Sequence, residues 1–418
     1  MTLKKRILII AYYFPPLSGP GVQRPLKFVK YLPEFSWEVF VLTVKNPYWY
    51  YAHDPFLLQD VPSSVQIKRS VLIKVDIIGE LFKRIGLRRL GYFFNKYCLL
   101  PDETIGWLPS SLVKAIQMIR TNNIRVVYTT SGPYSCHLIG YFISKLLNVR
   151  WIADFRDEWY DHPVLRHKYK NMEVHRILEK AVVKHCDCVM SAHPTITNNL
   201  KKRYYSINSN KFFTITNGYD EQDFKYINVQ RTNNILKIVH VGRIYGFTGR
   251  TINVFLEAIS QLILEGRIKR DQISLMFVGM DDISFSRKVF GNVIQCIGYV
   301  SHRKSIDYLC QSDVALLVLD GKRDIYPGKL FEYLRARRPI LAIVPENGIT
   351  AKLILKAKAG IVVDPKNIVE IKKSIIELIE IKRRGISNSL FDDNVVKNYE
   401  RRYLTEKFAT LLDRMISE

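Results

Sequence analysis

The stretch Asp324–Ile340, DIYPGKLFEYLRARRPI, gives the clearest indication of the fold. Two apolar runs, Val314–Leu319 and Ile340–Val344, flank it and are typical of buried strands. A Pro-Gly pair interrupts the chain before Lys329–Ala336, which we expect to form a helix because proline suits the first turn of a helix. The order strand, turn, helix, strand predicts an α/β fold with a parallel sheet.

Carboxylates on both sides of this turn indicate what it could bind. A helix that starts at the carboxyl end of a buried strand presents backbone N–H groups to an anion. Glu332 lies one turn into the predicted helix, and Asp324 lies eight positions before it. This arrangement suits a ligand with hydroxyls beside a phosphate, such as a nucleotide-sugar. The alternative is an ordinary amphipathic helix between two buried strands.

The composition narrows the class of protein. The 418 residues are enough for two or three domains, and 47% of them are hydrophobic. A net charge of +24 favours an anionic partner, which could be nucleic acid, anionic lipid or a phosphate ligand. The sequence contains no established nucleic-acid-binding motif, so we do not expect nucleic acid. Six scattered cysteines indicate no disulfide framework and predict a reducing, cytoplasmic setting.

A strand, loop, helix and second strand open the chain. We expect strands at Arg6–Ala11 and Trp37–Val44 and a helix at Val22–Leu32. This unit is typical of a doubly wound domain. Gly19 and Gly21 lie in the loop before the helix, and glycine lets the backbone approach a ligand closely. The alternative is a tight turn without a ligand.

Charged residues also follow a later strand of the first half. Val149–Phe155 is expected to be a strand, and it ends in the sequence DFRDEW. Asp154 and Asp157 therefore lie where carboxylates face the ligand crevice of an open α/β sheet. The alternative is a structural pair between an aspartate and Arg156.

His137 is a further candidate in the first half. It lies in TSGPYSCH, after the expected strand Ile124–Thr129. The ordinary pKa of histidine is near neutrality, so this side chain could act as a general base. The alternative is a structural histidine whose hydrogen bonds are satisfied.

The segment 70–100 combines apolar and basic residues in a helical pattern. We predict an amphipathic basic helix or helical hairpin that lies on an anionic membrane surface. The alternative is a helix that packs on the core and has a solvated basic face. The pattern comprises Ile73, Ile77, Leu81, Ile85 and Leu90 with Lys74, Lys83, Arg84, Arg88, Arg89 and Lys96.

Five segments, in chain order, resemble the retaining glycosyltransferases of family 4, which have the GT-B fold. They are the loop around Gly19, the WIADFRDEW strand, the NGYD stretch, the Gly-Arg pair ending at Arg243 and the GKLFEYL region. The last segment resembles many bacterial polysaccharide transferases. The family carries Glu-x7-Glu there; Glu332 matches the second glutamate, but Asp324 replaces the first.

The resemblance implies two Rossmann-like α/β domains that face a cleft containing the active site. Residues 1–217 would form the acceptor-binding domain and residues 218–395 the nucleotide-sugar-binding domain. The polar stretch 219–234 would link them, and residues 396–418 would form a helix that crosses back to the first domain. The implied enzyme is a hexosyltransferase that retains anomeric configuration. Its leaving phosphate takes the acceptor's proton, so no protein base is assigned with certainty.

The resemblance also assigns donor contacts. Glu332 would bind the ribose diol, and Asp324 would contact sugar hydroxyls as a catalytic candidate. The backbone N–H groups of Gly328, Lys329 and Leu330 would bind the diphosphate.

Arginines are expected to complete the diphosphate site. Arg243 matches the family's arginine after the first strand of the second domain. Thr248 occupies the usual position of the family's lysine, and Arg250 would substitute for it. We therefore expect protein cations in place of a metal, with no cofactor.

On the acceptor side, Gly19, Gly21 and Asp157 would lie near the sugar or acceptor, and Asp154 and His137 are catalytic candidates. The acceptor would be a saccharide or a lipid-linked molecule in polysaccharide biosynthesis, with the protein peripheral on the inner face of the membrane. Two other functions remain open. One is a GT-B sugar-nucleotide epimerase, and the other is a non-enzymatic basic protein that binds a membrane surface or nucleic acid.

Overall fold

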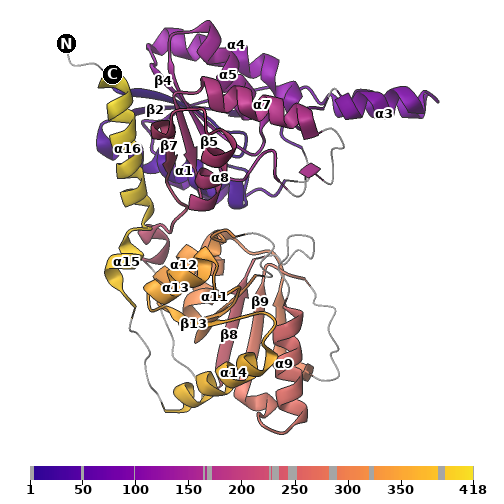
Figure 1. The fold of residues 1–418 in the computed structure, drawn as a ribbon, viewed down its shortest axis with the longest axis vertical. Helices are drawn as coiled ribbons and strands as arrows, with labels where there is room; N and C mark the ends of the chain where they lie inside the picture. The colour runs from indigo at the N-terminus through magenta and orange to yellow at the C-terminus, as the bar shows by residue number, and fades with distance from the viewer. Residues whose placement is uncertain are drawn as a thin grey trace. The chain divides into compact units, whose positions relative to one another are not determined.

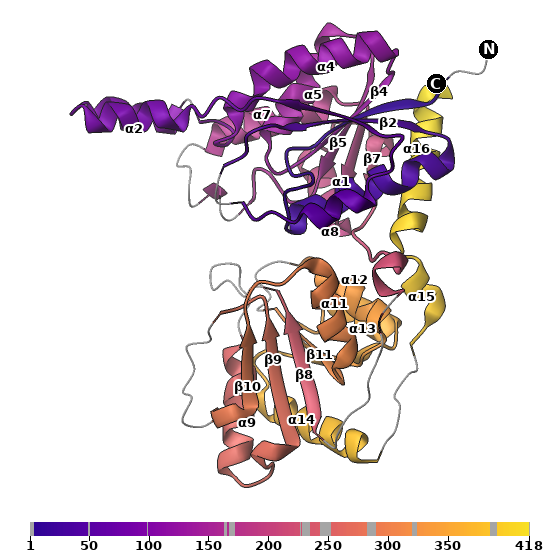
Figure 2. The same cartoon turned by 180° about the vertical axis from the view of Figure 1, so that it is seen from behind.

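The computed structural model describes residues 4–48, 51–97, 99–162, 165–166, 172–225, 227, 235–242, 252–281, 290–319, 324–384 and 391–417. The chain forms two compact units (Figures 1 and 2). Unit 1 comprises residues 1–217 and 401–418, and unit 2 comprises residues 218–400. Each is an α/β domain built on a parallel sheet, as predicted. Within the described residues, no helix is both long and apolar enough to cross a membrane.

Unit 1 contains a seven-stranded sheet in the order β3-β2-β1-β4-β5-β6-β7. All its neighbouring strands run parallel. The strands are β1 (Arg6–Ile10), β2 (Glu38–Val44), β3 (Gln66–Ser70), β4 (Val126–Thr130), β5 (Arg150–Phe155), β6 (Cys188–Ser191) and β7 (Phe212–Thr214). The helices around it are α1 (Pro20–Tyr31), α4 (Leu108–Asn122), α5 (Ser135–Leu146), α7 (Met172–His185), α8 (Pro194–Arg203) and α16 (Arg401–Ser417).

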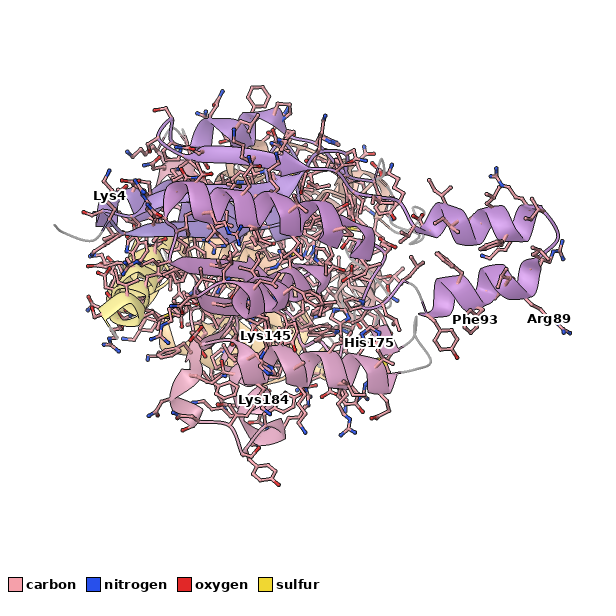
Figure 3. All side chains as sticks on the ribbon, turned by 90° about the horizontal axis from the view of Figure 1, so that it is seen from above. Lys4, Arg89, Phe93, Lys145, His175 and Lys184 are labelled. Atoms are coloured by element: carbon pink, nitrogen blue, oxygen red, sulfur yellow. The ribbon has the colours of Figure 1, made fainter. Side chains whose placement is uncertain are left out.

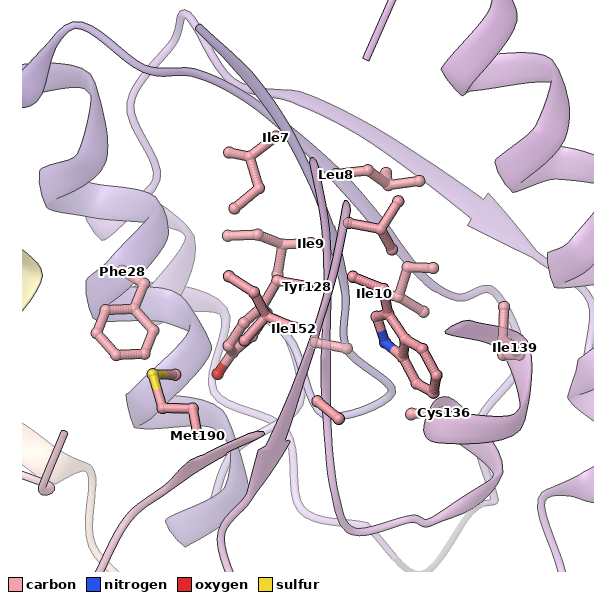
Figure 4. Close-up of a cluster of buried hydrophobic side chains, with 14 of the residues drawn as sticks. Ile7, Leu8, Ile9, Ile10, Phe28, Tyr128, Cys136, Ile139, Ile152 and Met190 are labelled. Carbon is pink, nitrogen blue, oxygen red and sulfur yellow. The ribbon is translucent and has the colours of Figure 1, made fainter. Parts of the chain in front are cut away.

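The first strand shows why this sheet is buried on both faces. Successive side chains of a strand point to opposite faces, so an uninterrupted apolar run supplies both faces with core residues. Ile7 and Ile9 of β1 point toward Phe28 of α1, whereas Leu8 and Ile10 lie on the side of Ile139 of α5 (Figure 4). The central strands therefore lie between helices on both faces.

The C-terminal helix α16 packs on unit 1. Phe408 lies 4.7 Å from the ring of Phe28, and Asp413 accepts a hydrogen bond from Trp37 Nε1 at 3.1 Å. The expected single helix from residue 396 is divided, because α15 (Asp393–Lys397) ends before α16 begins at Arg401. Helix α15 stays with unit 2, since Val396 is buried in that unit's core.

A hairpin of two helices, α2 (Asp76–Arg84) and α3 (Arg88–Tyr97), follows β3. It projects away from the rest of unit 1 (Figures 1, 2 and 3). The structure thus shows a helical hairpin in the segment 70–100 rather than a helix packed on the core. Strand β3 itself, at residues 66–70, was not predicted from the sequence.

Unit 2 contains a six-stranded parallel sheet in the order β10-β9-β8-β11-β12-β13. Its strands are β8 (Leu236–Val241), β9 (Ile273–Val278), β10 (Ile294–Ile297), β11 (Val314–Val318), β12 (Ile340–Ile343) and β13 (Gly360–Val363). Helices α9 (Asn253–Leu264) and α14 (Ile368–Arg383) share one apolar cluster with the sheet. Helices α11 (His302–Gln311), α12 (Lys329–Ala336) and α13 (Ile349–Lys356) share the cluster on the other face.

A further sequence expectation differs from the structure. The expected linker 219–234 begins with a short packed segment, in which Tyr219 and Phe224 are buried in the core of unit 2. Aromatic side chains in that polar stretch are the signal that it packs.

Candidate functional site

In each of the two sheets the strand order reverses at one point. In open α/β folds, ligands bind at this point, outside the carboxyl ends of the strands. In unit 1 the reversal lies between β1 and β4, and in unit 2 it lies between β8 and β11. Of the predicted acceptor-side residues, Gly19 lies in the loop after β1, Gly21 in the first turn of α1, and Asp157 in the loop after β5. The residue after β8 and the start of α12, which follows β11, carry the predicted donor-side residues.

Lys329 and His240 meet at the reversal point of unit 2. Lys329 Nζ lies 3.0 Å from His240 Nε2, and His240 Nδ1 lies 3.0 Å from the carbonyl oxygen of Leu316. A carbonyl only accepts and an ammonium only donates, so Nδ1 carries the proton and Nε2 accepts. His240 is therefore neutral, and it orients the Lys329 ammonium without neutralising its charge.

Gly242, the residue after β8, leaves room for this ammonium. Its φ is +98°, a conformation that favours glycine, and a Cβ there would lie 3.0 Å from Lys329 Nζ. The ammonium thus lies against the backbone at the carboxyl end of β8. The side chain of Lys329 was not predicted to be part of the site, since only its backbone N–H was assigned to the diphosphate.

Glu332 is held by a histidine that sequence reasoning missed. His302 Nε2 donates to Glu332 Oε1 at 2.8 Å, and His302 Nδ1 lies 3.8 Å from Asp223 Oδ2. His302 is the first residue of α11, and the preceding Ser301 caps this helix by accepting a hydrogen bond from the Lys304 N–H. The imidazole therefore fixes the orientation of the Glu332 carboxylate, which remains partly exposed.

Asp324 is exposed and attached to the start of α13. Its Oδ1 accepts a hydrogen bond from the Ile349 N–H at 2.7 Å, and the hydroxyl of Thr350 donates to the carbonyl of Ile325 at 2.7 Å. These bonds hold the segment before α12 against α13. A pocket of about 240 Å³ lies here, at the carboxyl ends of β11 and β12. It is lined by Leu319, Asp324, Ile325, Val344, Pro345, Asn347, Gly348 and Thr350.

The start of α12 corrects one predicted contact. The N–H of Leu330 donates to the carbonyl of Pro327 at 2.9 Å, and the Leu330 side chain is fully buried. Its N–H is thus engaged within the turn rather than presented to a phosphate. Gly328 is exposed at the helix start, and its contact with an anion stays a prediction. Arg243, Thr248 and Arg250 lie outside the described residues.

On the acceptor side, the loop after β1 meets the residues that follow β4 and β5. A Cβ at Gly21 would lie 2.7 Å from Arg156 Nη1 and 2.9 Å from the Tyr13 ring, so this position admits only glycine without rearrangement. The Arg156 guanidinium lies over the Tyr13 ring and donates to the carbonyls of Ser131 and Gly132. Arg156 therefore joins the loops after β1, β4 and β5.

Gly19 and Asp157, the other two predicted acceptor-side residues, are close in sequence to the residues that meet at Arg156. Gly19 is exposed at the start of α1 and has φ +109°. Asp157 is half-buried two residues after β5. The structure thus places both at the carboxyl edge of the sheet in unit 1, the edge where ligands bind in this class of fold.

Asp154 has no exposed surface and forms a buried ion pair with Arg24. The Arg24 Nε and Nη2 donate to the two carboxylate oxygens at 2.8 Å each, and Tyr128 and Thr130 also donate to Oδ2. Burial alone would raise the pKa of Asp154, but Arg24 and these donors hold it below its ordinary value. A carboxylate enclosed in this way does not reach a substrate, so we assign Asp154 a structural role instead of the catalytic one.

His137 is likewise a core residue. Its Nδ1 lies 2.9 Å from Thr129 Oγ1, and its ring lies 4.7 Å from that of Phe155. Burial lowers the pKa of His137 to about 3, and Nε2 has no hydrogen-bond partner among the residues that the structure describes. A fully buried imidazole that stays neutral above pH 4 has neither access to an acceptor nor the basicity of a general base at pH 7.

The low pKa of His137 predicts a pH-dependent stability. The unfolded imidazole takes up a proton below about pH 6.5 and the folded one does not, so stability falls as the pH falls. Between pH 7 and pH 5 this residue should cost about 2 kcal/mol in the free energy of unfolding. Urea unfolding of the wild type and His137→Gln at both pH values measures it. An equal pH dependence in the two proteins would contradict the buried neutral state.

Comparisons with known proteins agree with this architecture. Residues 236–380 match the family model described as glycosyl transferases group 1. No curated protein matches the sequence. Trehalose-6-phosphate synthase OtsA is similar in structure, at 12% identity and a TM-score of 0.65, over 98% of this chain and 99% of that one.

Two further solved structures are similar over nearly their whole length. One is described as trehalose-6-phosphate from E. coli bound with UDP-2-fluoro glucose, at 12% identity and a TM-score of 0.62, over 98% of this chain and 99% of that one. The other is a candidate UDP-N-acetylglucosamine 2-epimerase from Listeria monocytogenes, at 12% identity and a TM-score of 0.57, over 99% and 97%. The chain therefore has the GT-B fold, and its second unit carries the match to glycosyl transferases group 1.

Proposed function

We propose that the protein is a retaining glycosyltransferase of family 4 that transfers a sugar from a nucleotide-sugar to an acceptor hydroxyl. The observation that carries this proposal is the Lys329 ammonium, held by a neutral histidine at the reversal point of the unit 2 sheet. This is the position where α/β domains bind nucleotide phosphates. The family match of residues 236–380 and the solved neighbour bound with UDP-2-fluoro glucose support the same assignment.

Lys329 is proposed to bind the diphosphate. It is the first residue of α12, so its ammonium adds to the positive end of the helix dipole. A lysine at this end of a helix is destabilising for the free protein, and a phosphate compensates for it. Lys329 would thus supply the charge that the family places at the position of Thr248. Arg243 and Arg250 remain proposed partners of the same group.

Glu332 is proposed to bind the ribose diol. Its carboxylate lies on the first turn of α12, one helical turn from Lys329, so both side chains can reach one nucleoside diphosphate. Carboxylate oxygens accept hydrogen bonds from hydroxyls, and His302 keeps the carboxylate oriented for them. Asp324, which lines the neighbouring pocket, is proposed to contact the sugar hydroxyls.

These groups allow a transfer step without a protein base. The bond between the anomeric carbon and the diphosphate oxygen breaks, and a bond to the acceptor oxygen forms on the same face of the sugar. The acceptor proton passes to the leaving diphosphate. Lys329 and the arginines stabilise the charge that develops on this leaving group, so we propose that no metal ion is needed.

The acceptor is proposed to lie at the carboxyl edge of the unit 1 sheet, near Gly21, Tyr13 and Arg156. We propose a lipid-linked acceptor, a place in bacterial polysaccharide biosynthesis and a peripheral location on the inner face of the cell membrane. The net charge of +24 supports attraction to an anionic membrane surface.

The Glu332→Gln variant tests the donor site. The nucleoside diphosphate that most stabilises the wild type is first identified by thermal shift, where 100 times the dissociation constant adds about 2.7 kcal/mol of stability. Calorimetric titration should then show Glu332→Gln binding about 10- to 100-fold more weakly, because a charged hydrogen bond contributes about 1.5–3 kcal/mol.

Two further variants sharpen this titration. His302→Asn should weaken binding less than Glu332→Gln does, because it affects only the orientation of the carboxylate. Glu377→Gln, an exposed residue of α14, should leave the affinity unchanged. Equal affinities of the wild type and Glu332→Gln would remove Glu332 from the site.

An epimerase is the second candidate, favoured by the likeness to the Listeria monocytogenes protein. Such an enzyme converts a nucleotide-sugar without any acceptor. Incubating the protein with a nucleotide-sugar alone therefore separates the two functions, and a change of the sugar's stereochemistry would replace the transferase proposal.

A further inference from the structure

The hairpin of α2 and α3 exposes most of its large apolar side chains. The helices approach most closely at two glycines, since a Cβ at Gly91 would lie 2.5 Å from the carbonyl oxygen of Gly79. Both glycines are buried, and the rings of Phe82 and Phe94 lie 6.2 Å apart. Close packing through glycine leaves little apolar area inside the hairpin, so its larger side chains extend outward.

The outward side chains form an apolar surface on both helices. Most soluble helices bury their large apolar residues, and a contiguous exposed group of them marks an interaction site. Here the exposed residues recur on both helices, and Phe93 lies on the projecting hairpin in Figure 3. They include Ile77 (58% exposed), Leu81 (55%), Ile85 (60%), Leu87 (49%), Leu90 (45%), Tyr92 (66%) and Phe93 (58%).

Basic residues accompany this apolar surface. Between Lys74 and Tyr97 the sequence has six lysines and arginines against two acidic residues. Four of the basic residues, Lys83, Arg84, Arg88 and Arg89, surround the turn between the helices. A basic tip next to exposed isoleucines, leucines and aromatics is the composition of elements that enter the interface of anionic bilayers.

We propose that the α2–α3 hairpin inserts its apolar side chains into the headgroup region of an anionic membrane and anchors the protein there. The charge favours lipid over a second copy of the chain, because pairing two hairpins would bring their basic tips together. The anchor goes beyond electrostatic attraction: its apolar contacts persist at high salt, whereas the basic residues set the preference for anionic lipid.

The base of the hairpin is attached firmly to unit 1. Tyr48 donates to Asp76 Oδ1 at 2.7 Å at the start of α2. After α3, the Asp102 carboxylate accepts hydrogen bonds from the N–H and the hydroxyl of Ser135, the first residue of α5. Helix α5 follows β4, so the hairpin is joined to the carboxyl edge of the sheet where the acceptor is proposed to bind. The position of the hairpin favours an acceptor that is itself held in the membrane, an inference that rests on the proposed function.

Vesicle co-sedimentation of the full chain tests the anchor. The wild type should bind phosphatidylcholine vesicles that contain phosphatidylglycerol, and part of this binding should survive 0.5 M salt (roughly a 4 Å screening length). The double variant Leu81→Ser/Phe93→Ser should bind about tenfold or more weakly at both salt concentrations, because it removes inserted apolar area. Arg84→Gln/Arg88→Gln should lose binding mainly at low salt. Leu264→Ser, which removes a leucine of unit 2 that is 74% exposed, should bind as the wild type does.

Vesicle binding and nucleoside diphosphate affinity are measured separately, so the membrane anchor and the proposed transferase can be refuted independently. Wild-type binding equal to that of Leu81→Ser/Phe93→Ser would overturn the anchor, as would a concentration-dependent dimer that this variant abolishes in sedimentation velocity. Nucleoside diphosphate affinity, measured without vesicles, should be the same in the hairpin variants and the wild type. A protein that binds vesicles but no nucleotide would refute the proposed transferase and leave the anchor standing.

Discussion

Replacing Lys329 with methionine is expected to lower the rate of sugar transfer about 100-fold, because a single preorganised cation at a developing charge has an effect of this size. Methionine keeps the length of the side chain and removes its charge. The ammonium lies at the start of α12 and next to Gly242, so the substitution removes positive charge where the diphosphate is proposed to bind. The effect is measured as the rate of sugar transfer from a nucleotide-sugar of the nucleoside diphosphate that thermal shift identifies.

Affinity measurements on Lys329→Met distinguish the loss of a diphosphate contact from a general structural defect. Lys329→Met should weaken nucleoside diphosphate binding about 10-fold or more while leaving nucleoside binding nearly unchanged, because only the diphosphate faces the ammonium. Lys373→Met, an exposed lysine of α14, serves as the matched control. If Lys329→Met kept the wild-type rate, a group other than Lys329 would have to stabilise the negative charge of the leaving diphosphate. The same assay in excess EDTA tests the proposed independence from metal.

The elements of the fold could largely be predicted from the sequence. Apolar runs and turn residues are local signals, so helix α12 was predicted with the bounds that the structure shows, and strand β2 was predicted to within one residue. Weaker local signals failed: the edge strand β3 alternates exposed and partly buried residues, and it was missed. An amphipathic helix or helical hairpin was predicted in the segment 70–100 because its apolar and basic residues repeat at helical spacing, and the structure has the hairpin.

The pairing of site residues could not be predicted in the same way. Lys329 and His240 are 89 positions apart, and Arg24 and Asp154 are 130 apart. Which of these side chains meet depends on the strand order and register of the sheets, and no local pattern contains that information. One signal was present, because a histidine between two valines of strand β8 needs polar partners when it is buried.

Asp154→Asn is expected to lower the free energy of unfolding of unit 1 by about 3–5 kcal/mol, because it leaves the buried Arg24 guanidinium without its counter-charge. The change is nearly isosteric, so it removes charge and little volume. Arg24 also donates to the carbonyl of Thr216 at 3.0 Å, close to the end of the first segment of unit 1. Chemical denaturation monitored by tryptophan fluorescence measures the loss. Glu173→Gln, an exposed residue of α7, should change stability by less than about 0.5 kcal/mol.

A second variant separates a structural ion pair from a catalytic carboxylate. Replacing both partners, as Arg24→Met/Asp154→Leu, should restore much of the lost stability, because apolar side chains of similar volume remove both buried charges together. Sugar transfer should recover with it if Asp154 acts only through the fold. Full stability without activity in the double variant would instead return Asp154 to the catalytic group. The complete burial of the carboxylate and its four donor contacts lead us to expect recovery of both.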